Sequence, residues 1–78
     1  MSITISRKDD QRWTCAGSMF FAGFNEVGDP VTVDVSQEAW EIIMADYPDR
    51  IGKVEQMAND PRASWHDFGA DKVLRVYL

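Results

Sequence analysis

The stretch VTVDVSQEAWEIIMADYPD, residues 31–49, indicates the fold class, because the spacing of its apolar residues changes part-way along it. Its first five residues alternate, with three valines on one face and Thr32 and Asp34 on the other, as in a half-buried strand. After Ser36 the apolar side chains recur at helical spacing, as Trp40, Ile43, Met44 and Tyr47. The sequence therefore predicts a strand that leads directly into a helix.

Local signals define both ends of this helix and indicate a second one. The Ser36 hydroxyl is a suitable N-cap for the amide of Ala39, and Pro48 ends the helix because proline disfavours helical conformation at the residue before it. Residues 49–59 suit a second short helix, although Gly52 weakens that prediction. Its inward-facing side chains would be Ile51, Val54 and Ala58.

Strand character also appears in other parts of the chain. Residues 2–6 and 12–16 both alternate, and we expect them to pair as a hairpin across the polar break RKDDQ. Residues 17–24 could continue the second of these strands past a glycine bulge. Residues 72–78 are apolar on both faces, which predicts a strand in the interior of the sheet. Residues 63–69 are expected to form a loop or a single turn.

Together these elements predict one α+β domain. The economical arrangement is a small antiparallel sheet of about four strands, with one main helix and a second short helix packed on one face. A chain of 78 residues has room for one such core and buries only about 60% of the surface that its unfolded form exposes. We therefore expect marginal stability.

Charge is distributed unevenly along the chain. Residues 24–49 carry seven acids and no base, whereas the formal charge of the whole chain is −5. Because this part would repel phosphates, we expect no direct nucleic-acid partner. The longest apolar run has nine residues, two of them glycine, so we expect no membrane span. The single cysteine, Cys15, points to a reducing cytoplasm.

The predicted helix has an acidic arc opposite its apolar stripe. No base lies three or four residues from these acids within the helix, so the usual stabilising pairs are missing. We interpret the arc as a protein-binding face, on which the acids steer a basic partner and an isoleucine fills a small apolar pocket. The arc contains Glu38, Glu41, Ile42, Asp46 and Asp49. If the neighbouring strand edge and loop lie beside the helix, further acids would extend it, namely Glu26, Asp29 and Asp34.

Two other interpretations of the same features stay open. The arc could be an ordinary solvated face, since a single exposed isoleucine is normal. The chain could also be a structural or assembly module, most simply a homodimer that pairs an edge strand or buries the apolar residues 19–21. A mass in solution that depends on concentration would distinguish the homodimer.

No group of residues predicts an active site. His66 is expected to be a partly exposed loop residue, and Cys15 a small core residue beside Trp13. One cysteine and one histidine are too few for a zinc site, and no glycine-rich loop is present to hold a phosphate. Trp65 and Phe68 are expected to pack over the end of the sheet. We therefore expect no enzyme, no metal and no cofactor.

The order of segments resembles that of small proteins of Mu-like phages, in which a hairpin with a basic turn precedes a small helix opened by serine or threonine. The residues that carry this resemblance lie between positions 3 and 50, as ITISRKDDQRWTCAG, a valine strand and DVSQEAWEIIMADYPD. In size, acidity and lack of catalytic residues, the chain is also similar to anti-CRISPR proteins. Several members of that class use an acidic face to block nucleic-acid binding by a CRISPR complex.

These resemblances imply a function for the acidic arc. We expect a small protein of a phage or mobile element that acts in the cytoplasm of a host cell without catalysing a reaction. Its partner would be a host protein with a basic nucleic-acid-binding surface, such as a CRISPR effector, and the carboxylates would occupy the place of phosphates.

Overall fold

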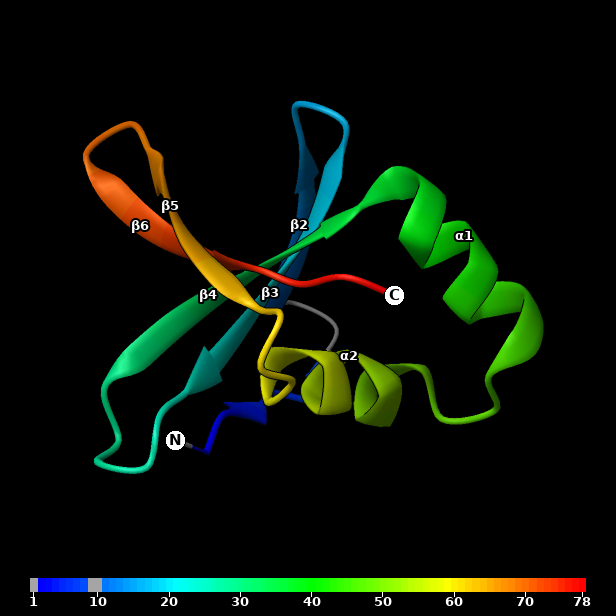
Figure 1. Cartoon of the computed structure of the whole chain (residues 1–78), viewed down its shortest axis with the longest axis horizontal. Coiled ribbons are helices and arrows are strands. Elements are labelled where there is room, and N and C mark those ends of the chain that lie inside the picture. The colour runs from blue at the N-terminus through cyan, green and yellow to red at the C-terminus, as the bar shows by residue number, and fades with distance from the viewer. Residues whose placement is uncertain (1, 9–10) are drawn as a thin grey trace.

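The computed structural model describes residues 2–8 and 11–78 of the chain. Figure 1 shows how the strands and helices of this part are arranged. Their bounds are β1 Thr4–Ile5, β2 Arg12–Cys15, β3 Ser18–Phe24, β4 Pro30–Ser36, α1 Gln37–Asp46, α2 Arg50–Ala58, β5 Ser64–Phe68 and β6 Asp71–Arg75. The strand order is β1-β3-β4-β6-β5, and β2 also pairs with β3.

The predicted α+β class is confirmed, because two helices pack against one sheet. In detail the sheet has six strands instead of about four. It is also mixed, since β4 and β6 run parallel while the other described pairs are antiparallel. Strand β6 lies between β4 and β5, so the expected interior strand near the end of the chain is confirmed.

The predicted hairpin between residues 2–6 and 12–16 is wrong. In the described part of the chain, β1 and β2 both run antiparallel to β3 and share its outer edge. The hairpin is instead β2–β3, and its two-residue turn consists of Ala16 and Gly17, with φ of 51° and 80°. Two residues with positive φ form the turn that matches strand twist. The polar break that was expected to be the turn includes residues 9–10, which lie outside the described part.

Two segments without a clear sequence pattern are strands. Residues 17–24 contain the whole of β3, which pairs with β4 along its full length. Residues 63–69, expected to be a loop or a single turn, contain β5, which joins β6 through a turn at Gly69 and Ala70. The segment SWHDF mixes polar and aromatic residues, so its strand conformation comes from pairing with β6 rather than from alternation.

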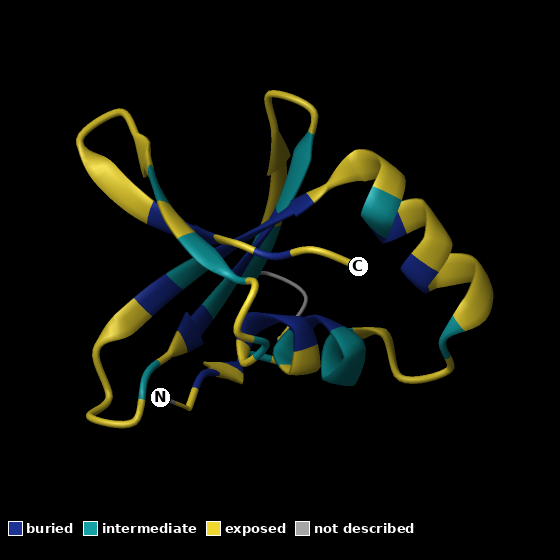
Figure 2. Ribbon diagram, in the orientation of Figure 1, coloured by how far each residue is buried: buried dark blue, intermediate teal, exposed yellow. Residues whose placement is uncertain are grey.

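The main core lies between the helices and one face of the sheet, and Figure 2 shows its buried segments in dark blue. Of the predicted helix stripe, Trp40 and Ile43 are buried and Tyr47 packs against the core with part of its surface exposed. Met44 is 44% exposed, contrary to the prediction, because it lies on the flank of the stripe. The largest fully buried side chains on this side of the sheet are Phe21, Ile3, Ile43, Leu74, Val33, Val35 and Val54.

Both helix starts have side-chain caps. The Ser36 hydroxyl accepts the amide of Ala39 at 3.1 Å, which confirms the predicted N-cap of α1. The carboxylate of Asp49 accepts the amide of Gly52 at 3.0 Å and caps α2. In the described part of the chain, no helix is long and apolar enough to cross a lipid bilayer.

Candidate functional site

The outer side of α1 is the candidate site. Its acids are exposed, Ile42 lies among them, and Met44 is exposed at the border between this side and the buried stripe. Both Ile42 and Met44 are 44% exposed, so the apolar part of this surface is larger than the sequence analysis predicted. We call this surface the acidic face of α1 and define it as Glu38, Glu41, Ile42, Met44 and Asp46.

The acids of this face make no ion pair within the described residues. The guanidinium–carboxylate pairs recorded between described residues lie elsewhere, at the N-cap of α2, in the loop after α2 and on the sheet. Unpaired carboxylates on one helix repel one another, so this face carries an electrostatic cost that a basic partner would remove. The three pairs are Arg7–Asp49, Arg62–Asp60 and Arg75–Asp34.

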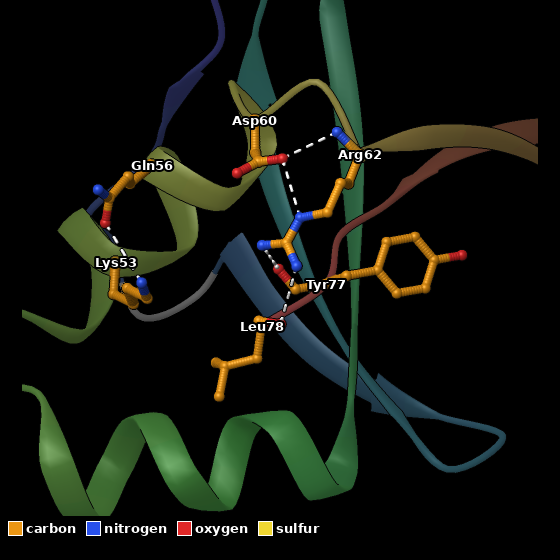
Figure 3. A network of polar contacts seen from close by, with 6 residues as sticks. All are labelled: Lys53, Gln56, Asp60, Arg62, Tyr77 and Leu78. Carbon is orange, nitrogen blue, oxygen red and sulfur yellow. Dashed lines mark hydrogen bonds and ion pairs between the residues drawn. The ribbon is translucent and has the colours of Figure 1, made fainter.

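Figure 3 shows how one of these arginines is held. The Nε of Arg62 donates to Asp60 Oδ1 at 3.1 Å, and its Nη1 donates to the carbonyl oxygen of Leu78 at 3.2 Å. The backbone N–H and then the guanidinium of Arg62 lower the pKa of the Asp60 carboxyl. This arginine therefore ties the segment after β6 to the end of α2.

Asp49, predicted to belong to the acidic arc, has a structural role instead. Its carboxylate caps α2 and also accepts Arg7 Nη1 at 3.0 Å. The guanidinium of Arg7 and the amide of Gly52 lower the pKa of Asp49, and the carboxylate raises the pKa of Arg7 in return. An added Cβ at Gly52 would overlap this carboxylate, so the glycine that weakened the helix prediction makes room for the cap.

Asp34, predicted as a flank of the binding face, is not available to a partner. It is only 3% exposed and lies on the face of the sheet away from the helices. Arg75, its neighbour on β6, donates from Nε to Asp34 Oδ2 at 3.3 Å. The alternation of β4 was predicted correctly, but the burial of its second face depends on strands that the sequence does not place.

Glu26 and Asp29 are exposed but lie far from α1. They belong to the turn between β3 and β4, at the opposite end of β4 from α1 (Figure 1). The seven residues of β4 separate the turn from the helix by roughly 20 Å at about 3.3 Å per residue. The predicted continuous patch of seven acids is therefore divided, and its helical part stands alone.

A hollow of about 550 Å³ opens at the C-terminal end of α1. Met44 and Asp46 of the acidic face line it, together with Tyr47 and two arginines, Arg12 and Arg50. Arg50 Nη2 donates to the carbonyl oxygen of Met44 at 3.3 Å. The hollow therefore adjoins the acidic face of α1.

Other sequence expectations for single residues need correction. Cys15 is exposed on β2, not part of the core. Phe68 does pack on Phe20 over the sheet, but Trp65 and Phe68 stay 46% and 42% exposed. His66 lies in strand β5 and is partly buried, with Nε2 at 2.8 Å from Ser64 Oγ. Within residues 2–8 and 11–78, no three histidine, cysteine or acidic side chains come close enough together to hold a metal ion.

Three comparisons with known proteins found no relative of this chain. No protein-family model, curated protein or solved structure matches the chain.

Proposed function

We propose that this chain is a non-enzymatic inhibitor that binds a basic surface of another protein through the acidic face of α1. One observation carries the proposal: Glu38, Glu41 and Asp46 have no ion pair within the described residues, while Ile42 and Met44 are 44% exposed beside them. A purely solvating face needs charge but does not need two large apolar side chains.

The two kinds of side chain would act at different stages of binding. Carboxylates attract a basic partner over about a Debye length and orient it before contact. Ile42 and Met44 would then lose water against the partner, which slows dissociation. The hollow beside Met44 could accept a partner side chain in the same step.

The partner that suits this chemistry is a protein with a groove built for nucleic acid. Such grooves present rows of lysine and arginine to phosphates, and three carboxylates on one helix can occupy the same positions. The resemblance to small phage inhibitors makes a CRISPR effector in the host cytoplasm the first target to test.

The test is inhibition of DNA binding by a purified, guide-loaded CRISPR effector. The site variant combines Glu38→Gln, Glu41→Gln and Asp46→Asn, and it leaves Asp49 intact because that carboxylate caps α2. A matched control removes three exposed acids elsewhere, through Glu26→Gln, Asp29→Asn and Asp67→Asn. Both variants have the same net charge, so any difference between them reports position.

We expect the native chain and the control to inhibit alike, and the site variant to inhibit about tenfold less well, which corresponds to about 1.4 kcal/mol. Raising the salt from about 0.1 M to 1 M shortens the Debye length from about 10 Å to about 3 Å and should weaken inhibition steeply. Equal inhibition by both variants, or inhibition that is insensitive to salt, would contradict the proposal. If no effector responds, capture from nuclease-treated lysate with the same pair of variants extends the search.

A homodimer is the second candidate function. A dimer interface at residues 19–21 is not needed to bury them, because Phe20 and Phe21 are only 2% and 1% exposed within one chain. The edge strand β5 is a better site, since it pairs with β6 on one side and carries the half-exposed Trp65. A mass in solution that rises with concentration, and falls in a Trp65→Lys variant, would favour this function.

A further inference from the structure

The face of the sheet away from the helices has a small apolar cluster of its own. Phe20 on β3 and Val73 on β6 point away from the main core, and each is only 2% exposed. In Figure 1 the β2–β3 and β5–β6 hairpins splay apart on either side of β4. Side chains from both hairpins meet over β4, which is why residues on an uncovered face are buried.

Three aromatic rings form the centre of this cluster. The ring of Trp13 stacks on Phe20 with 5.6 Å between centroids and 18° between planes. Phe68 lies on the other side, 5.2 Å from Phe20 and tilted by 55°. Trp13 and Phe68 are 45% and 42% exposed, so each keeps free surface next to the buried ring. They line a pocket of about 220 Å³ with Thr32, Val73 and Asp71.

The charges of this face favour a cation in the pocket. Asp71 is the only charged residue among the described residues that line it. Asp34 and Arg75 also lie on this face, but they pair with each other and leave no net charge between them. His66, also on this face, lies with Nε2 within hydrogen-bond distance of Ser64 Oγ. The mouth of the pocket therefore combines aromatic rings with one carboxylate.

We propose that this pocket binds the cationic side chain of a basic protein or peptide, with arginine as the best fit. A cation over the exposed ring of Trp13 or Phe68 would lie within about 6 Å of an aromatic centroid, the range of cation–π attraction. A guanidinium can also stack flat on the indole of Trp13 while its edge donates to the Asp71 carboxylate.

The size and charge of the site argue against other occupants. A second copy of this chain would need about 800 Å² of surface on each partner, and two half-exposed rings offer far less than that. A nucleic acid would place phosphates beside Asp71, without a basic groove to offset the repulsion. A single cationic side chain fits both the small size of the pocket, about 220 Å³, and its negative charge.

This site does not depend on the acidic face of α1. The pocket and α1 lie on opposite faces of the sheet, so variants of one leave the other intact. The pocket could hold a second segment of the same partner or a different basic peptide, and its chemistry is the same in either case.

The test is an NMR titration that follows the indole N–H signals of Trp13, Trp40 and Trp65. The probes are acetyl-Gly-Arg-Gly-amide and its neutral isostere with citrulline in place of arginine. We expect the arginine peptide to shift the Trp13 signal, to leave the buried Trp40 unmoved, and to bind at least about fivefold more tightly than the citrulline peptide.

Variants make the assignment specific. Asp71→Asn removes the carboxylate at an exposed position, and Phe68→Leu keeps an apolar side chain but removes the ring. Each should weaken binding of the arginine peptide, whereas the triple site variant of α1 should bind it like the native chain. The proposal is overturned if both peptides bind equally, if the arginine peptide leaves Trp13 unmoved, or if Asp71→Asn has no effect.

Discussion

Asn59 binds the backbone of Ile3 through both the oxygen and the nitrogen of its side-chain amide. Its Oδ1 accepts the N–H of Ile3 at 2.7 Å, and its Nδ2 donates to the carbonyl oxygen of Ile3 at 3.0 Å. One turn earlier on α2, Glu55 Oε2 accepts the N–H of Ile5 at 2.9 Å. Side chains of α2 thus occupy the outer edge of β1, where a neighbouring strand would otherwise pair.

This arrangement predicts a large effect of Asn59→Ala on stability. The change leaves the Ile3 groups without their partner in a partly buried place, so we expect a loss of about 1–3 kcal/mol in the free energy of unfolding. Urea denaturation measures it, and hydrogen exchange at the Ile3 amide should accelerate. Gln56→Ala, at an exposed position of the same helix, is the control and should stay within about 0.5 kcal/mol. A loss no larger than that of the control would contradict the role of Asn59.

Arg75 is predicted to neutralise a buried carboxylate. Arg75→Met leaves the Asp34 carboxyl group, which is 3% exposed, without its partner, so stability should fall. Because Arg75 is itself 44% exposed on its side chain, we expect about 1–2 kcal/mol, below the range for fully buried pairs. Lys72→Met removes an exposed base from the same strand and should change little.

A double-mutant cycle separates the pair from its surroundings. If Arg75 acts through Asp34, then adding Asp34→Asn to Arg75→Met should recover part of the lost stability, since no charge is left buried. Additive losses in the double variant would show that the two residues act independently.

The Arg7–Asp49 pair predicts a pH dependence of stability. The pKa of Asp49 is lowered below its ordinary value of 3.8, chiefly by the hydrogen bond from Arg7. A carboxyl with a lowered folded-state pKa stabilises the fold above its unfolded pKa, and this contribution is lost as pH falls through the folded value. The difference in melting temperature between the native chain and Arg7→Gln should therefore be constant above about pH 5 and shrink below about pH 4.

A melting series from pH 7 down to pH 2 measures this difference. Lys8→Gln removes a neighbouring exposed base as the control. A difference between the native chain and Arg7→Gln that persists unchanged at the lowest pH would show that Arg7 stabilises the fold without acting on Asp49.

Cys15 is predicted to react rapidly while the protein is folded. It is exposed on β2, so a thiol reagent such as DTNB should reach it without unfolding. We expect one equivalent to react at nearly the same rate with and without denaturant, and none in Cys15→Ser. A rate that rises manyfold on unfolding would instead place this thiol in a protected position.

Features that depend on neighbouring residues could be predicted from the amino-acid sequence. Spacing or capping within a few residues predicts the change from strand to helix at Ser36 and the role of Ser36 as N-cap. The same kind of signal predicts the second helix and the interior position of the last strand. The exposed acids of α1 follow from the same periodicity. Such signals are readable because they involve contacts between residues that are close in the chain.

The pairing of the strands, and the burial of the sheet face away from the helices, depend on contacts between distant parts of the chain. The partner of β1 and β2 is β3 rather than each other, and β5 becomes a strand by pairing with β6. Asp34 pairs with Arg75, which is 41 residues away in the sequence. Because of this contact Asp34 does not belong to the exposed binding face that its charge had predicted. The aromatic pocket likewise needs two hairpins that lie far apart in the chain. Pairings of this kind depend on the packing of the whole sheet, and the sequence pattern of one short segment does not predict that packing.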